Sequence, residues 1–241
     1  MKNLNITIII AVLLIVLGTL FGIYLLKNNS SNTISASGNY QMSVAPDQVI
    51  VYLLIETRSK SADDAKNKNS LISESVLNAL SGIGIDKSTI QTENYNIYPE
   101  YDWNNGAQTL KDYVTSNNIK IKTNDFGKVG KIVDAAVNAG ALVSYINFEL
   151  TPEKNNQYKS QVLTEASKDA KVKAESIALG LGKKLGSLVS VSSQDYNYMP
   201  YPMYTRTDQA AGAMEVKSAV TNIQPKNLDV SASVSVVYNI K

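Results

Sequence analysis

Residues 6–26 form one uninterrupted apolar run, and this run constrains the chain more than any other feature. Its sequence is ITIIIAVLLIVLGTLFGIYLL, it contains no charged side chain, and Lys2 and Lys27 flank it. An α-helix rises about 1.5 Å per residue, so a helix of this length spans the ~30 Å hydrocarbon layer of a bilayer. A helix also satisfies every backbone polar group within the segment, which that layer requires. We therefore expect Ile6–Leu26 to be a membrane anchor.

A cleaved secretory signal is the alternative interpretation of this run. Such signals have an apolar core of about 7–15 residues followed by a cleavage site of small residues. Here the apolar run is longer, the next residues are KNNSSNT without an Ala-x-Ala motif, and no cysteine follows to carry a lipid. We favour a retained single-pass anchor over residues 1–27, a flexible tether over residues 28–33 and one domain over residues 34–241. This domain is expected outside the cell membrane.

The composition excludes several classes of function. All 21 acidic residues lie after Lys27, and Lys2 and Lys27 are two of the 23 basic residues, so the domain carries no formal net charge. A nucleic-acid binder needs a basic surface, and we expect no nucleic-acid partner. The chain has no cysteine and no histidine, which excludes disulfides, Ser-His and Cys-His triads and histidine-ligated zinc. Carboxylate or Ser-Lys chemistry, oxygen-bound Ca²⁺ or Mg²⁺, and no reaction at all remain, and the last is the simplest.

The periodicity of the remaining segments predicts an α+β domain in which helices pack on antiparallel sheets, in the order ββαββαβαββ. Alternating or continuous apolar segments rich in β-branched residues predict strands, and apolar residues three or four apart predict helices. The predicted strands are Ile34–Val44, Gln48–Thr57, Ile90–Trp103, Gln108–Thr123, Leu142–Leu150, Leu188–Ser193 and Leu228–Ile240. The predicted helices begin at Ser61, at Lys128 and after Thr151, and they end near Gly82, Asn138 and Leu181.

Turn residues predict how two pairs of strands connect. Ala45-Pro46-Asp47 is typical of a turn, so the first two strands are expected to form an antiparallel hairpin. Asn105-Gly106 is a stronger hairpin signal, because both central positions of its turn need positive φ. Asn104 is then expected opposite Ala107. Pairing outward from there places Glu100 opposite Lys111, Tyr98 opposite Tyr113, Tyr101 opposite Leu110 and Ile97 opposite Val114.

Strict alternation along Gln108–Thr123 places Val114 and Ile119 on opposite faces. We therefore expect a bulge or a strong twist between them. The outer half of this long hairpin is expected to project beyond the sheet.

Two helices have apolar stripes that predict which side packs on a sheet. The stripe of the first helix is Leu71, Ile72, Val76, Leu77, Leu80 and Ile83. The stripe of the last helix is Val162, Ala166, Ala170, Ala174, Ile177 and Leu181, and its small residues favour close packing. Asp63-Asp64 is interpreted as favourable charge at a helix start rather than as a metal-ligand pair.

Aromatic residues gather in two places, which we take as a candidate interaction surface. The long hairpin carries Tyr98, Tyr101 and Trp103, and residues 194–226, for which no regular structure is predicted, carry Tyr196, Tyr198, Tyr201 and Tyr204. Tyrosine and tryptophan often mark contact surfaces because they bury a large area at low entropic cost. The alternative is that these tyrosines pack on their own loops.

A glycan-binding protein or a carboxylate-based glycosidase is the second functional hypothesis. Glu100 and Asp102 share one strand face close to Tyr98 and Trp103, and carboxyl groups roughly 7 Å apart suit an inverting pair. Both acids are expected near an exposed turn, which offers no protected cleft. Asp102-x-Asn104-x-Gly106 faintly resembles a Ca²⁺ loop but is better explained as a hairpin turn. No catalytic, cofactor-binding or metal-binding residue is assigned.

Several short motifs resemble, in order, those of the SIMPL-domain family, which includes bacterial periplasmic immunogenic proteins. The motifs are Val44-Ala-Pro-Asp47 after the first strand, Gly84-Ile-Asp86, Ile90-Gln-Thr92, Tyr98-Pro-Glu-Tyr101, Lys128–Ala136, Lys171–Val189 and Val230-Ser-Ala-Ser-Val234. The family usually shows Gly-x-Gly in the first strand, where this chain has Gly38-Asn39-Tyr40. The resemblance implies an α+β fold and ring-forming assemblies on the envelope side, and it supplies no catalytic residue.

The sequence thus predicts a membrane-anchored, extracytoplasmic SIMPL-domain protein that is not an enzyme. It is expected to hold the membrane through Ile6–Leu26, to self-associate into a homo-oligomer and to serve an envelope or stress-related role. No cofactor is expected, and the ligand, if there is one, is unknown.

Overall fold

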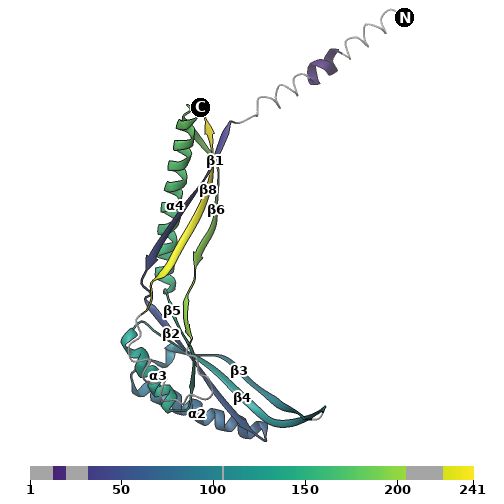
Figure 1. Ribbon diagram of the computed structural model, residues 1–241, viewed down its shortest axis with the longest axis vertical. Coiled ribbons are helices and arrows are strands. Elements are labelled where there is room, and N and C mark those ends of the chain that lie inside the picture. The colour runs from purple at the N-terminus through teal and green to yellow at the C-terminus, as the bar shows by residue number, and fades with distance from the viewer. Residues whose placement is uncertain (1–12, 20–31, 105, 205–224) are drawn as a thin grey trace, which may run out of the picture. The chain divides into compact units, whose positions relative to one another are not determined.

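The computed structural model describes residues 13–19, 32–104, 106–204 and 225–241 (Figure 1). Of the expected anchor Ile6–Leu26 it describes only residues 13–19, which are helical. Most of that anchor and of the tether over residues 28–33 lies outside the described residues. Within the described ranges, no helix combines the length and the apolar character that a bilayer crossing requires.

The chain folds as α+β, with helices and two antiparallel sheets, as the sequence predicts. Its described elements are, in order, β1 (Thr33–Val44), β2 (Gln48–Ser59), α2 (Ala62–Gly82), η1 (Lys87–Thr89), β3 (Ile90–Asn104), β4 (Ala107–Thr123), η2 (Phe126–Lys128), α3 (Val129–Asn138), β5 (Leu142–Glu149), α4 (Pro152–Gly180), β6 (Leu185–Tyr198), β7 (Tyr201–Tyr204) and β8 (Leu228–Ile240). The predicted order lacks only β7 and the two short η turns.

The chain divides into two compact units, which are described separately. The first unit includes residues 32–40, 161–196 and 232–241, and the second includes residues 41–160, 197–204 and 225–231.

The second unit is built around β2, which lies at the centre of a five-stranded sheet of order β3-β4-β2-β5-β7. β2 pairs antiparallel with β4 and with β5. Its alternate side chains Val49, Val51, Leu53 and Ile55 are fully buried. They form one core with apolar residues of α2 and α3, which cover this face of the sheet (Figure 1).

The expected hairpin between the first two strands is wrong. β1 belongs to a three-stranded sheet of order β1-β8-β6, whereas β2 belongs to the five-stranded sheet. The physical reason is that β4 and β5 occupy both edges of β2. The turn before β2 is nevertheless well anchored, because the Asp47 carboxylate accepts hydrogen bonds from the backbone N–H and the hydroxyl of Thr151, at 2.7 and 2.8 Å.

The expected bulge between Val114 and Ile119 lies in the pairing of β4 with β3, where the register shifts between Thr92↔Ile119 and Asn94↔Asn118. On its other side, β4 pairs with β2 without a bulge, from Val49↔Thr123 to Ser59↔Tyr113. As expected, Val114 and Ile119 lie on opposite faces of the sheet, and both are buried.

The pairing of β3 with β4 has a second bulge, between Glu100 and Tyr101, which the sequence does not predict. The predicted pairs Asn104↔Ala107 and Tyr101↔Leu110 are confirmed. Beyond the second bulge the register is shifted, so the pairs are Glu100↔Asp112, Tyr98↔Val114 and Ile97↔Thr115. The turn chemistry fixes the pairing only as far as that bulge.

A buried polar seam joins α2 to the sheet. Asn69 is fully buried, and its amide donates to the carbonyl of Ile55 at 2.8 Å and to that of Thr115 at 3.2 Å. Its carbonyl oxygen accepts from Ser73, whose hydroxyl in turn accepts from the amide of Asn117. Buried polar groups need such partners because an unpaired one costs the full desolvation penalty. The predicted helical stripe is correct for Val76 and Leu80 but not for Leu71, which is exposed.

In the first unit, α4 lies unusually close to β1. The buried residues of its stripe are Val162, Ala166, Ala170, Ala174 and Ala178. A Cβ atom at Gly38 would lie 2.1 Å from the carbonyl oxygen of Ala166 and 2.2 Å from the amide nitrogen of Ala170. The small-residue stripe is therefore confirmed over its first four positions, whereas Ile177 and Leu181 are exposed and Ala178 replaces them.

Asp169 of α4 holds the same strand by hydrogen bonds. Its carboxylate accepts from Lys173 at 2.6 Å and from the backbone N–H of Asn39 at 2.9 Å. Both bonds lower the pKa of Asp169, and the bond from Lys173 has the larger effect.

Residues 194–204 are more regular than the sequence suggests, because β6 continues to Tyr198 and β7 adds a fifth strand beside β5. The remainder of the stretch, residues 205–224, lies outside the described residues.

We predict that Gly38→Ala lowers the free energy of unfolding by at least about 3 kcal/mol, because the added methyl group meets helix backbone that cannot move aside. Urea unfolding followed by circular dichroism measures this change. Gly180→Ala is the matched control, since nothing lies within 4 Å of a Cβ atom there, and it should be neutral or slightly stabilising. Equal stability of the two variants would show that the close approach is not rigid.

We predict that Asn69→Ala lowers the free energy of unfolding by about 2–3 kcal/mol, because it removes the donor to two carbonyl groups and the acceptor of the Ser73 hydroxyl. The control is Asn78→Ala, an exposed asparagine on the same helix, which should change stability by less than about 0.5 kcal/mol. Similar losses in both variants, measured by urea unfolding, would rule out a special role for the seam.

Candidate functional site

The β3–β4 hairpin presents the predicted aromatic residues on two different faces. Tyr101 and Trp103 share one face, and Tyr98 lies on the other, because side chains alternate along a strand. Trp103 is 71% exposed, whereas Tyr98 and Tyr101 are 43% and 44% exposed. Three further exposed apolar residues, which the sequence analysis did not single out, follow the Tyr101 face: Tyr95, Ile97 and Leu110.

Glu100 and Asp102 belong to an ion network. Lys111 lies 3.8 Å from a carboxylate oxygen of each acid, and Arg58 lies 3.4 Å from Glu100. Both carboxylates are thus paired with cations on an open strand. A glycosidase acid instead needs a carboxyl group that retains its proton in a protected cleft. The geometry therefore favours a structural role for this pair, and a glycan-binding role for Trp103 stays a prediction.

Gly106 has φ +79°, the positive value expected at its position of the turn, and Asn105 lies outside the described residues. Across the described residues, no group of three acidic side chains is placed to hold a metal ion.

The second group of predicted tyrosines lies on β6 and β7. The hydroxyl of Tyr198 accepts a hydrogen bond of 2.7 Å from the backbone N–H of Leu150, so this tyrosine is engaged within its own unit. Burial raises the pKa of Tyr196. The backbones of Tyr201 and Tyr204 pair with those of Phe148 and Tyr145. The structure does not describe the side chains of Tyr201 and Tyr204.

A stacked pair of tyrosines on the sheet was missed by the sequence analysis. Tyr52 and Tyr145 are neighbours across β2 and β5, and their ring centroids are 4.2 Å apart. The pKa of Tyr52 is raised to about 12. Burial is the largest cause, and the neighbouring Tyr145, Glu93 and Glu149 contribute less. The pair was missed because the pairing of β2 with β5 depends on which segments meet in space.

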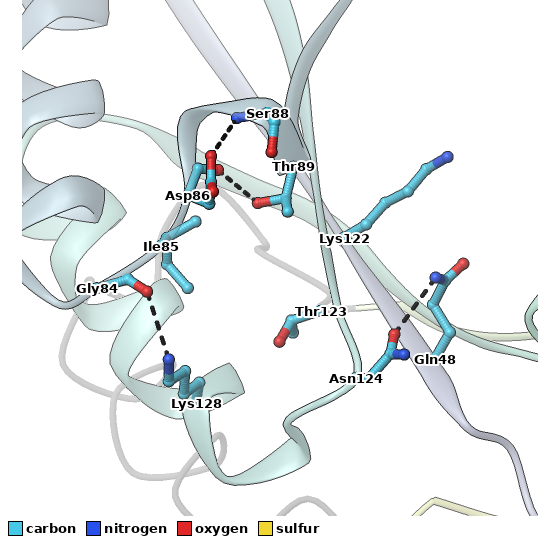
Figure 2. A pocket seen from close by; sticks show the side chains of 10 residues that line it. All are labelled: Gln48, Gly84, Ile85, Asp86, Ser88, Thr89, Lys122, Thr123, Asn124 and Lys128. Atoms are coloured by element: carbon cyan, nitrogen blue, oxygen red, sulfur yellow. Dashed lines mark hydrogen bonds between the residues drawn. The ribbon is translucent and has the colours of Figure 1, made fainter.

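A cavity of about 500 Å³ in the second unit is the other candidate site (Figure 2). It lies between the segment that follows α2 and the segment that follows β4, with the first residue of β2 at its border. Its lining residues are Gln48, Gly84, Ile85, Asp86, Ser88, Thr89, Lys122, Thr123, Asn124 and Lys128.

Local sequence signals fix both walls of this cavity. Gly84 has φ +78°, which lets the chain turn after α2 at low steric cost. Asp86 then caps η1, because its carboxylate accepts from the backbone N–H of Ser88 at 2.8 Å. On the other wall, Asp125 caps η2 through the backbone N–H of Gly127 at 3.0 Å. Such local side-chain to backbone bonds are typical of turns that hold one conformation.

The lining is polar and carries two cations and one anion. The hydrogen bond from Ser88 lowers the pKa of Asp86, and Figure 2 shows this carboxylate turned back toward its own loop. Lys128 donates to the carbonyl of Gly84 at 3.4 Å rather than to the hydroxyl of Ser88. Ser88 and Lys128 therefore do not form the Ser-Lys pair that catalysis by such a pair would need. The hydrogen-bond donors of the lining suit binding better than catalysis.

A sequence profile described as "SIMPL: Protein of unknown function (DUF541)" matches residues 34–238. The chain belongs to the SIMPL family. This confirms the resemblance drawn from its motifs, and the Gly84-Ile-Asp86 turn that carried part of that resemblance forms one wall of the cavity.

Several SIMPL-family relatives match most of the chain. The "26 kDa periplasmic immunogenic protein" of Brucella melitensis is 28% identical over 217 residues, which cover 86% of this chain and 84% of the relative. "Uncharacterized protein YggE" of Edwardsiella ictaluri is 27% identical and covers 85% of each chain. The protein of the same name from Escherichia coli K12 is 26% identical over 70% of this chain and 69% of the relative.

Proposed function

We propose that this SIMPL-family protein is a membrane-anchored envelope protein that acts outside the cytoplasm by self-association rather than by catalysis. The apolar run over residues 6–26 supports the anchor because it matches the thickness of a bilayer. The word "periplasmic" in the name of the Brucella relatives supports an extracytoplasmic location. The absence of cysteine and histidine from the chain supports a role without catalysis.

The observation that carries the self-association is the uncovered strand β6. Among the described strands it lies at one edge of its three-stranded sheet. Leu188, Val189 and Val191 are 50–55% exposed, and they occupy both faces of the strand because side chains alternate. Monomeric proteins usually protect such an edge with lysine, proline or a covering element.

The first nine residues of β6, LGSLVSVSS over residues 185–193, contain no charge and no proline. The charged residue of the strand, Asp195, lies near its other end. The unpaired backbone groups of an apolar edge are a template for another strand, and a second copy of this chain is the partner we propose. The opposite edge of the sheet is β1. Pairing of one edge with a different edge of the next copy is heterologous and produces rings when the rotation closes.

We predict that the full-length protein, purified in mild detergent, has the protein mass of an oligomer. The double variant Val189→Lys, Val191→Lys should shift it to a monomer, because two ammonium groups on the edge strand oppose pairing with a second strand. Light scattering coupled to size-exclusion chromatography measures both masses.

Val172→Lys is the matched control, since this valine of α4 is 58% exposed but lies off the strand. It should leave the oligomer intact. A monomeric wild-type protein at high concentration would contradict self-association, and an intact oligomer in the double variant would contradict the role of β6.

A further inference from the structure

We propose that the cavity between the turn after α2 and the end of β4 binds a small solute that carries a phosphate or carboxylate group. Its volume of about 500 Å³ lies within the range of small-molecule sites. All of its lining residues belong to the second unit. The inference does not depend on self-association, since it uses none of the residues of β6.

The lining offers more hydrogen-bond donors than acceptors. Thr123 already accepts from the backbone N–H of Asp125, so its hydroxyl proton is available to a ligand. Asn124 uses its carbonyl oxygen to accept from Gln48, which leaves its NH₂ group. The side chain of Ser88 is engaged by Asp86 and is not counted. A ligand that accepts several hydrogen bonds at once satisfies this lining best, and oxyanions are the strongest such acceptors.

The ammonium group of Lys128 supplies the charge for an oxyanion. Its bond to the carbonyl of Gly84 is 3.4 Å long, beyond the usual hydrogen-bond range, so exchanging it for an anion costs little. The side chain of Lys122 extends away from the other lining residues in Figure 2 and is not part of the proposed anion site.

Asp86 places a negative charge at one end of the cavity. Its carboxylate is fixed by the N–H of Ser88, while Thr89 donates to its backbone carbonyl at 2.7 Å. An oxyanion is therefore favoured beside Lys128 and disfavoured beside Asp86. A solute that also carries hydroxyl groups fits both ends, because hydroxyl groups donate to a carboxylate.

The walls are set before any ligand arrives. The turn at Gly84, the cap at Asp86 and the cap at Asp125 hold both segments by local bonds. Preorganised walls increase affinity because little conformational entropy is lost on binding.

The test is a titration of the full-length protein with inorganic phosphate at constant ionic strength, with the methyl group of Ile85 as an NMR reporter inside the cavity. We expect a saturable shift of the Ile85 signal. Lys128→Gln should weaken the apparent affinity by about five-fold, as loss of one charge-assisted hydrogen bond predicts. Lys128→Glu, which reverses the charge at this position, should abolish the saturable shift.

Lys131→Gln is the matched control, because this lysine is exposed on α3 close to Lys128 but does not line the cavity. It should bind phosphate as the wild type does. Parallel titrations with acetate distinguish a general oxyanion site, which binds both, from a phosphate site, which binds phosphate only. The absence of a saturable shift with either anion, or equal affinity in all variants, would overturn the proposal.

Discussion

β2 pairs with β4 on one side and, over Gln48–Leu54, with β5 on the other, while its alternate side chains lie under α2 and α3. Val49, Val51, Leu53 and Ile55 have no exposed surface, and full burial of each such side chain contributes about 1.5–3 kcal/mol before entropic costs. Because both edges at the start of β2 are occupied, β1 pairs elsewhere. The same arrangement places Asn69 over the two neighbouring strands and sets the ends of β2 and β4 beside the cavity.

Much of the fold is local and could be predicted from the sequence. The period of two in Leu228–Ile240 and the small-residue stripe of α4 both follow from which side chains must be buried. The Asn-Gly turn predicts the first pairs of the long hairpin because its backbone conformation is fixed by residue type. The succession of motifs was sufficient to identify the SIMPL family.

The errors concern partners distant in sequence. Adjacent strands usually pair, and nothing in the residues around Pro46 signals that β4 and β5 already occupy β2. The bulge between Glu100 and Tyr101 also changes the register, and its one local signal is Pro99, because a proline within a strand is typical of edges and bulges. The cavity was missed for the same reason, since it joins the turn at Gly84 to residues 122–128, which are distant in the chain.

The candidate sites differ in how far residue type alone predicts them. Trp103 is exposed as expected, because the tip of a long hairpin has little to pack against. Tyr198 bonds to the backbone of Leu150, a contact that depends on the position of β6 relative to β5. Exposed aromatic and aliphatic residues, an unprotected edge strand and a donor-rich cavity are all features suited to binding, and together they favour a protein that works through contact.

The central claim of this account is that residues 6–26 hold a binding domain outside the cytoplasm. Protease digestion of right-side-out membrane vesicles containing the full-length protein tests it most directly. The account predicts that the protein stays with the membrane after a high-salt wash and that external protease removes the domain from about residue 34 onward, as a single-pass anchor requires. Recovery of the protein in the soluble fraction, or a domain protected until the vesicles are opened, would contradict it.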